Sequence, residues 1–138
     1  DLKGAKLPDY NIVPLVGKFV AWKATKNHIL KIGIPSDAKR TSTLVGRKCR
    51  ASKIVVLGIY SKSGDLLPND TKSISMHDSK TIYKYTFNYV PILSDKYDDD
   101  ISIECTHGIH FFMTVKEVCD WLDIKDKKVP EKILNGGK

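Results

Sequence analysis

The sequence is poor in cysteine, in arginine and in long apolar runs. Three cysteines among 138 residues predict reduced thiols in a cytoplasmic protein and not a disulfide framework. No apolar run approaches the ~18 residues of a membrane-spanning helix, so we expect no membrane partner. The first ten residues lack the basic and then apolar layout of a secretory signal. The composition, 41% hydrophobic and 28% charged, predicts one globular domain that folds without a metal or a cofactor.

Positive charge is concentrated in the first half of the chain. The formal net charge is +7, yet residues 1–60 hold 12 Lys and Arg against 3 Asp and Glu, whereas residues 61–138 hold 11 against 13. Lysine abundance here indicates compositional bias more than nucleic-acid binding, because only three of the 23 basic residues are arginine. All three arginines fall in one short segment, and a guanidinium offers a planar fork of donors to phosphate or carboxylate. The predicted anion-binding residues are Lys39, Arg40, Arg47, Lys48 and Arg50.

Two other interpretations of this basic segment stay open. The segment could be a solvated loop that contacts no partner. Its arginines could instead pair within the chain, with the acidic run Asp98, Asp99 and Asp100. Both alternatives would leave the domain without an anion-binding surface at this place.

Hydrophobic patterning predicts six or seven short strands and one clear helix. The expected strands lie at residues 18–24, 28–34, 53–60, 71–77, 80–90, 101–104 and 109–113. Thr114 and Glu117 have the spacing of a capping box, and the apolar residues that follow recur at helical spacing. The expected fold class is α+β, with a mostly antiparallel sheet and one C-terminal amphipathic helix packed on it.

The chain divides into three expected segments. Residues 1–10 contain DLKGAKL, which fits the pentapeptide pattern A-(D/N)-L-x-x. One and a half such units cannot bury their own apolar face, so we expect them to end a longer repeat array. Residues 11–125 are expected to form the single α+β domain, and residues 126–138 a partly frayed tail with one further helical turn.

Four sequence segments follow one another in a specific order: GKFVAWK at Gly17–Lys23, IPSDAKR at Ile34–Arg40, GRKCRA at Gly46–Ala51 and CTHGIHFFMT at Cys105–Thr114. Together they resemble a domain of unknown function that follows pentapeptide repeats in proteins of giant DNA viruses. The resemblance extends over about residues 17–122. It implies a place at the end of a repeat array and, for a viral protein, the cytoplasm of the host cell. It implies no particular chemistry.

Three residues near the end of the chain could in principle bind zinc. Cys105, His107 and His110, joined by Cys49, supply the thiolate and imidazole ligands that zinc prefers. Their spacing lacks the paired Cys-x-x-Cys of structural zinc sites, and strand alternation directs His110 away from the other two. We therefore expect no metal, and buried apolar roles for the cysteines.

A Cys–His pair is the main enzymatic alternative. Cys49 lies between Lys48 and Arg50, whose charges would favour its thiolate, and His110 would act as the base. A weaker likeness to ADP-ribosyltransferases involves Gly108–Phe112, but no strand with the glutamate of those enzymes follows it. Neither arrangement forms a complete catalytic set in the sequence.

Four aromatic residues alternate along one predicted strand. Tyr83, Tyr85, Phe87 and Tyr89 share one face, which favours the core face of a sheet. A base-stacking platform for single-stranded nucleic acid is the alternative.

The sequence as a whole favours a non-enzymatic binding and capping module. It would offer the basic segment 39–50 to an anionic partner, either RNA or DNA or an acidic protein surface. The alternatives are an enzyme centred on Cys49 and His110, an ADP-ribosyltransferase-like fold, and a purely structural assembly domain.

Overall fold

Antiparallel strands and two short helices form the described part of the chain. The structure, a computed structural model, describes residues 13–14, 17–42, 49–75, 81–85, 91–93 and 109–137. The strands are β1 (Phe19–Ala24), β2 (His28–Ile34), β3 (Arg40–Ser42), β4 (Cys49–Ala51), β5 (Lys53–Ser61), β6 (Lys72–Ile74), β7 (Ile82–Lys84), β8 (Ile92–Leu93) and β9 (Ile109–Phe111). The helices are α1 (Val115–Trp121) and α2 (Lys128–Leu134). The α+β class and the antiparallel sheet are confirmed, but these residues contain nine strands and two helices instead of six or seven and one.

The largest sheet is built on a long hairpin. β1 pairs with β2 in an unbroken register from Phe19 opposite Ile34 to Ala24 opposite Ile29. Both strands carry apolar residues on both faces, which is typical of strands covered on two sides. β2 then pairs with β5, with one irregularity after Lys31, and β8 completes the order β1-β2-β5-β8.

A second sheet, in the order β3-β4-β9, is joined to the first at two places. The backbones of Trp22 and Phe112 exchange two hydrogen bonds, of 2.8 and 2.7 Å, which connect the end of β9 to β1. Only Ser52 separates β4 from β5, so these two strands form one bent stretch of chain that serves both sheets. The two sheets therefore curve around a shared interior.

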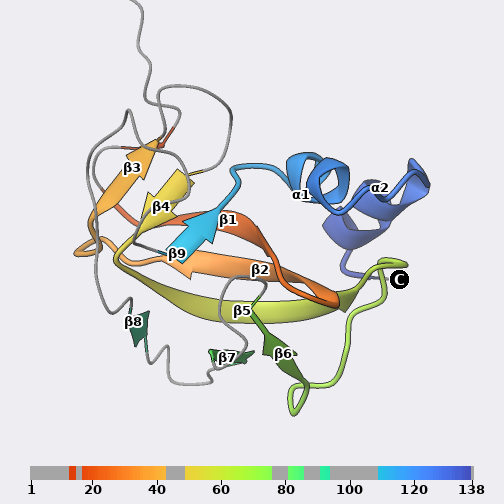
Figure 1. The fold of residues 1–138 in the computed structure, drawn as a ribbon, viewed down its shortest axis with the longest axis horizontal. Helices are drawn as coiled ribbons and strands as arrows, with labels where there is room; N and C mark the ends of the chain where they lie inside the picture. Colours follow the sequence, from red (N-terminus) through yellow and green to blue (C-terminus); the bar gives the residue numbers. More distant parts are fainter. Residues whose placement is uncertain are drawn as a thin grey trace, which may run out of the picture.

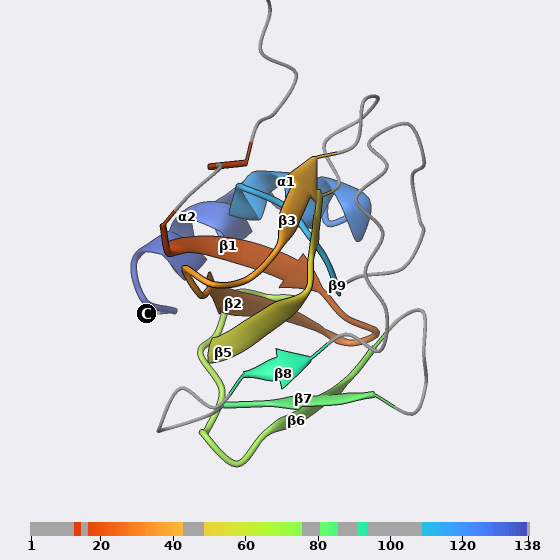
Figure 2. The same cartoon turned by 90° about the vertical axis from the view of Figure 1, so that its left-hand side faces the viewer.

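Two apolar clusters lie on the two faces of the β1-β2-β5 sheet. One face contacts the β3-β4-β9 sheet and β7, and its residues include Leu30, Ile32 and Phe111. The other face, with Trp22 and Ile29, packs against the helices. Both ribbon views place α1 and α2 on one side of this sheet and β6, β7 and β8 on the other (Figures 1 and 2).

The helices begin where side chains satisfy their first backbone amides. The Thr114 hydroxyl accepts the Glu117 amide at 3.2 Å, which confirms Thr114 as the predicted N-cap, and it donates to the Glu117 carboxylate at 2.8 Å. The Asp126 carboxylate accepts the Lys128 amide at 2.9 Å, and Pro130 occupies the first turn of α2, where its missing N–H costs nothing. Residues 126–138 were expected to form a partly frayed tail with one further helical turn. Within the described residues of this segment, α2 is seven residues long and packs against α1.

The strand predictions were accurate where both strand faces are apolar. The predicted strand 28–34 coincides with β2, and 18–24 and 53–60 differ from β1 and β5 by one residue. The sequence did not predict β3, β4 or β8. The predictions for residues 1–10 and 101–104 concern positions outside the described part. Within the described ranges, no helix combines the length and the apolar character needed to cross a membrane.

Candidate binding surfaces

Arg40, a predicted anion-binding residue, binds backbone carbonyls of its own chain. Its guanidinium also lies 5.3 Å from the centre of the Phe19 ring. Because the N–H donors of its guanidinium already bond to backbone carbonyl oxygens, Arg40 fixes the local loops and has few donors left for an external phosphate. The carbonyl oxygens that accept from it belong to Pro14, Gly17, Pro35, Ser36 and Ala38.

Arg50 lies inside the protein and not on its surface. It is the central residue of β4, opposite Thr41 on β3 and His110 on β9, and it is 0% exposed. A ligand cannot reach a side chain buried to this extent, so this part of the predicted patch is corrected. Lys39 is exposed, and Arg47 and Lys48 lie outside the described residues.

Cys49 and His110 do not converge. β4 and β9 pair with Cys49 opposite Phe111 and Arg50 opposite His110. Neighbouring residues of a strand project to opposite faces, so the Cys49 and His110 side chains leave the sheet in opposite directions. Cys49 is 0% exposed and belongs to the apolar interior with Phe111. The two side chains therefore do not form the Cys–His pair that was the enzymatic alternative.

The weak zinc candidates are only partly visible. Cys105 and His107 lie outside the described residues, so the absence of a zinc site formed with His110 stays a prediction. Elsewhere in the described ranges, no three His, Cys, Asp or Glu side chains gather as metal ligands would.

Tyr83, the first residue of the aromatic stripe, is a core residue. It is 4% exposed and belongs to the interior cluster. The ammonium of Lys23, itself 4% exposed, lies 5.4 Å from the centre of the Tyr83 ring and donates to the His110 carbonyl at 2.7 Å. Tyr83 therefore cannot stack on a base. Tyr85 is partly buried, and Phe87 and Tyr89 lie outside the described residues.

An exposed basic and apolar surface occurs where the sequence analysis expected none. In the β6–β7 hairpin, Lys72 lies directly opposite Lys84, and Ile74 lies opposite Ile82. Both lysines are exposed, and the isoleucines are 40% and 52% exposed. We call these four residues the lysine–isoleucine face. The alternation Lys-Ser-Ile and Ile-Tyr-Lys was a usable signal for it, but the register between the strands was not visible in the sequence.

Neither lysine of this face is neutralised within the described part of the chain. The ion pairs there join Lys53 to Asp37, Lys116 to Asp120 and Lys132 to Asp65. Ser75 donates its backbone amide to Thr81, so by alternation Lys72 and Lys84 occupy a non-hydrogen-bonded position. At such a position the Cα atoms are only about 4.5 Å apart. Like charges placed directly opposite each other destabilise a strand pair.

A buried hydroxyl–imidazole chain fixes the β6–β7 hairpin to the main sheet. His28 Nδ1 lies 2.7 Å from the Ser73 hydroxyl, which also contacts the Thr25 hydroxyl. The Lys26 amide donates to the Ile74 carbonyl at 3.0 Å. Ser73 and Thr25 are both 0% exposed, so this Ser–His contact is out of reach of a substrate and positions the hairpin instead.

We predict that His28, through these contacts, makes the free energy of unfolding depend on pH near neutrality. Burial, and then the charge of Lys62, lower the pKa of His28 from its ordinary value of 6.5. The unfolded chain therefore binds a proton at His28 at a higher pH than the folded chain does, so stability falls as the pH drops below about 6.5. Urea unfolding of the wild type and of His28→Gln, from about pH 7.5 to about pH 5, measures this.

The expected result is a larger loss of stability in the wild type than in His28→Gln over that range. The difference between the two proteins isolates His28 from the other three histidines of the sequence. Parallel pH profiles would contradict the prediction.

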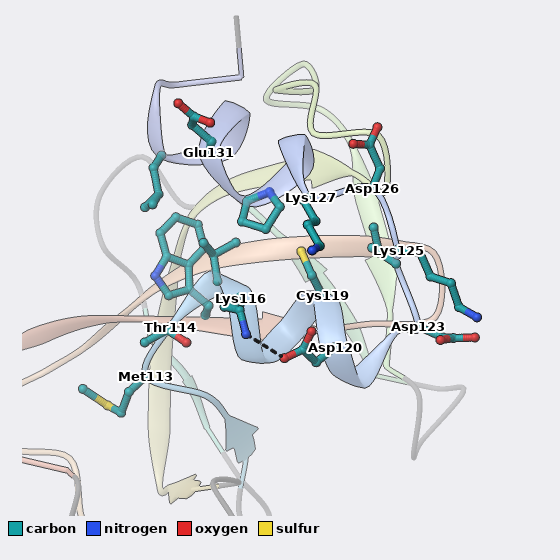
Figure 3. A pocket seen from close by; sticks show the side chains of 15 residues that line it. Met113, Thr114, Lys116, Cys119, Asp120, Asp123, Lys125, Asp126, Lys127 and Glu131 are labelled. Carbon is teal, nitrogen blue, oxygen red and sulfur yellow. Dashed lines mark ion pairs between the residues drawn. The ribbon is translucent and has the colours of Figure 1, made fainter.

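A groove lies between the two helices. Its volume is about 980 Å³, and Trp22, Val115, Cys119 and Pro130 are among the residues of its apolar floor. Charged side chains from α1, the connecting segment and α2 surround it, and the Lys116–Asp120 ion pair spans one turn of α1 (Figure 3). Burial and the neighbouring Asp120 raise the pKa of Cys119 to about 11, so its thiol is protonated near neutral pH and is no activated nucleophile.

These features define a small α+β domain with antiparallel sheets, a buried arginine, Arg50, and an exposed lysine–isoleucine face. The chain belongs to the Family of unknown function (DUF5758), whose model matches residues 10–118. The match includes all the described strands and the first turn of α1, and it ends before α2. Neither the curated proteins nor the solved structures contain a match to the chain.

Proposed function

We propose that this domain is a non-enzymatic binding module that uses the lysine–isoleucine face to bind an acidic protein surface. The observation that carries the proposal is the direct opposition of Lys72 and Lys84 in an exposed hairpin. Their mutual repulsion lowers the stability of the free protein, and carboxylates of a partner would relieve it. A feature that costs stability in the free state and is relieved in a complex is typical of a binding surface.

The neighbouring isoleucines favour a protein partner over nucleic acid. Ile74 and Ile82 together offer an apolar strip that a protein surface can cover, and buried apolar area is a main source of affinity between proteins. A phosphate backbone gives such a strip no partner. The side chains that would suit nucleic acid, Arg40, Arg50 and Tyr83, are held inside or against the domain.

The proposal keeps the anionic partner expected from the sequence but assigns a different surface to bind it. The binding surface is the β6–β7 hairpin instead of residues 39–50. The place of the domain after a pentapeptide array, in a viral protein acting in the host cytoplasm, is part of the proposal and is supported by the sequence resemblance alone. Residues 1–10, on which the capping role depends, lie outside the described residues.

A single charge reversal separates binding from folding. Lys72→Glu creates a Glu–Lys pair at the directly opposed position, so we expect it to raise the free energy of unfolding by ~0.2–1 kcal/mol. The same change should weaken binding to a labelled peptide of alternating glutamate and leucine by about tenfold, because it repels the carboxylates of the peptide. Urea unfolding and fluorescence anisotropy measure the two effects.

Lys125→Glu is the matched control, because Lys125 is exposed on the helix side of the sheet and undergoes the same charge change. It should leave peptide affinity nearly unaltered. Ile82→Ser should weaken binding of the peptide as well. If the natural partner were RNA instead, affinity for a short RNA would fall in Lys72→Glu but not in Ile82→Ser, and it would depend steeply on salt concentration. Equal peptide affinity of Lys72→Glu and Lys125→Glu would overturn the proposal.

A further inference from the structure

The outer edge of β7 is open in the described part of the chain. β6 and β7 form a separate two-stranded sheet, so each of these strands has one described neighbour. An edge strand presents backbone N–H and C=O groups with which another strand can pair. The register of the hairpin determines which residues present them.

Ile82 and Lys84 direct their backbone groups away from β6. The Ser75 amide donates to the Thr81 carbonyl at 3.0 Å, and these two residues stand opposite each other in the continued register of the hairpin. Hydrogen-bonded and non-hydrogen-bonded pairs alternate along two antiparallel strands. Ile82 and Lys84 therefore occupy non-hydrogen-bonded positions, and their N–H and C=O groups point outward from the β7 edge. Within the described ranges, no other backbone group bonds to them.

The corresponding edge of β6 is already used by the protein. Ile74 directs its carbonyl outward in the same way as Ile82, because the two residues are opposed. That carbonyl accepts the Lys26 amide at 3.0 Å, from the turn that joins β1 to β2. The hairpin is therefore attached to the main sheet through β6, on the side away from the helices (Figures 1 and 2). This leaves β7 as the edge at which a strand can be added.

The lysine–isoleucine face reaches this edge as two rows that cross the strands. Lys72 and Lys84 form one row, and Ile74 and Ile82 form the other. A strand paired with β7 would extend each row by one residue. In an antiparallel arrangement, the residue opposite Lys84 precedes the residue opposite Ile82 by two positions. Both of its side chains therefore lie on the lysine–isoleucine face.

We propose that β7 binds an extended acidic segment of a partner protein as an added antiparallel strand. The segment has a glutamate or aspartate opposite Lys84 and an apolar residue two positions later, opposite Ile82. Its backbone bonds to the outward N–H and C=O groups of these two residues and supplies affinity, whereas its side chains supply specificity. The inference rests on the proposed function, and it adds the conformation and the sequence pattern of the partner.

Charge favours an acidic segment over a second copy of this chain. In the part of the chain that the structure describes, neither Lys72 nor Lys84 takes part in an ion pair. A carboxylate opposite Lys84 forms a favourable cross-strand pair with it. A second copy would bring the same lysines and a net charge of +7 to the edge. Lysines on an exposed edge are a usual means of preventing like chains from pairing.

Backbone N-methylation of a peptide separates strand addition from binding by side chains alone. The probe is a labelled peptide of sequence Thr-Glu-Thr-Leu-Thr-Glu. One version is N-methylated at the first glutamate and at the leucine, whose amides would face β7. The matched version is N-methylated at the threonine after each of these residues, whose amides would face solvent. Fluorescence anisotropy should show about tenfold weaker binding of the first version than of the second, because two hydrogen bonds are lost.

Ile82→Pro makes the same test from the side of the protein. Proline removes an outward N–H that the hairpin does not use, and edge strands tolerate proline at such positions. Ile74→Pro is the matched control, because it makes the same change at the opposed position on β6. Ile82→Pro should bind the unmethylated peptide about three- to tenfold more weakly than Ile74→Pro does. Urea unfolding shows whether both variants fold, and the methylated peptides decide the question with the wild type if they do not.

Hydrogen exchange of the wild-type protein gives a direct measurement at the β7 edge. The Lys84 amide should exchange more slowly when the unmethylated peptide is bound, because it then donates to the added strand. An exchange rate that the peptide leaves unaltered would overturn the proposal. Equal affinity of the two methylated peptides would overturn it as well.

Failure of this inference can be distinguished from failure of the proposed function. If methylation has no effect but Lys72→Glu still weakens binding, side chains alone bind the peptide, and the proposed function stands without strand addition. If Lys72→Glu and Lys125→Glu also bind equally, both proposals fail. A dimer of the free protein that Ile82→Pro dissociates would identify a second copy as the occupant of the edge and would contradict an acidic partner strand.

Discussion

Replacing Arg50 by alanine should lower the free energy of unfolding by about 2–5 kcal/mol, the usual cost of truncating a large, fully buried side chain. Arg50 is 0% exposed at the centre of the β3-β4-β9 sheet and interacts with other groups there. The substitution removes the charge and also leaves a cavity where a long side chain was packed. Urea unfolding followed by tryptophan fluorescence measures the loss, and the folded fraction at equilibrium should fall accordingly.

Lys39→Ala is the matched control for Arg50→Ala. Lys39 belongs to the same basic segment but is exposed, so its loss should change stability by no more than about 0.5 kcal/mol. Arg50→Met adds a second comparison, because methionine fills much of the volume without a charge. It should cost less than alanine. If Arg50→Ala unfolded at the same urea concentration as Lys39→Ala, the internal role of Arg50 would be wrong.

Arg40→Lys should also destabilise the protein, by about 2–4 kcal/mol, although it preserves the charge. A lysine ammonium has three donors at one point, whereas the Arg40 fork reaches carbonyls in two separate stretches of chain, at Gly17 and at Pro35 and Ala38. Hydrogen bonds from charged donors contribute about 1.5–3 kcal/mol each, and the several bonds of one group are not additive. Thermal and urea unfolding together measure the effect.

The comparison for Arg40 is Lys53→Ala, which removes an ion pair with Asp37 in the same region. Asp37 is exposed, and pairs of this kind contribute only about 0–1 kcal/mol. The hydrogen bond from Lys53 holds the pKa of Asp37 below its ordinary value, but this exposed contact remains a small term. A smaller loss in Arg40→Lys than in Lys53→Ala would contradict the assigned role of the guanidinium fork.

The sequence predicted the strands whose two faces are both apolar. β2 coincides with its prediction because Ile29, Leu30 and Ile32 fill both faces and Pro35 ends the strand. The start of α1 was equally accessible, since the Thr114–Glu117 capping box is a local feature of the chain. α2 was underestimated because its buried side chains are few and lysines surround them.

The burial of Arg50 could not be predicted from local pattern. GRKCRAS looks like a charged surface loop, yet its Cys49–Ala51 part forms β4, a strand with no exposed residue. What determines its burial is the pairing of β4 with β9 from the far end of the chain. The same register sends Cys49 and His110 to opposite faces. The local pattern of a single sequence carries no signal for strand pairing over such a distance.

Lys23 has a consequence for the order in which this protein can fold. Its buried ammonium donates to a carbonyl 87 positions later in the chain, at His110 on β9. The β1–β2 hairpin can pair early, because its contacts are local. Until β9 is present, however, the hairpin lacks the carbonyl that accepts this hydrogen bond, and burying an ammonium without its hydrogen-bond partner is costly. β1 therefore reaches its final environment only when β9 is present, and we expect a chain shortened to end before β9 to lose stability.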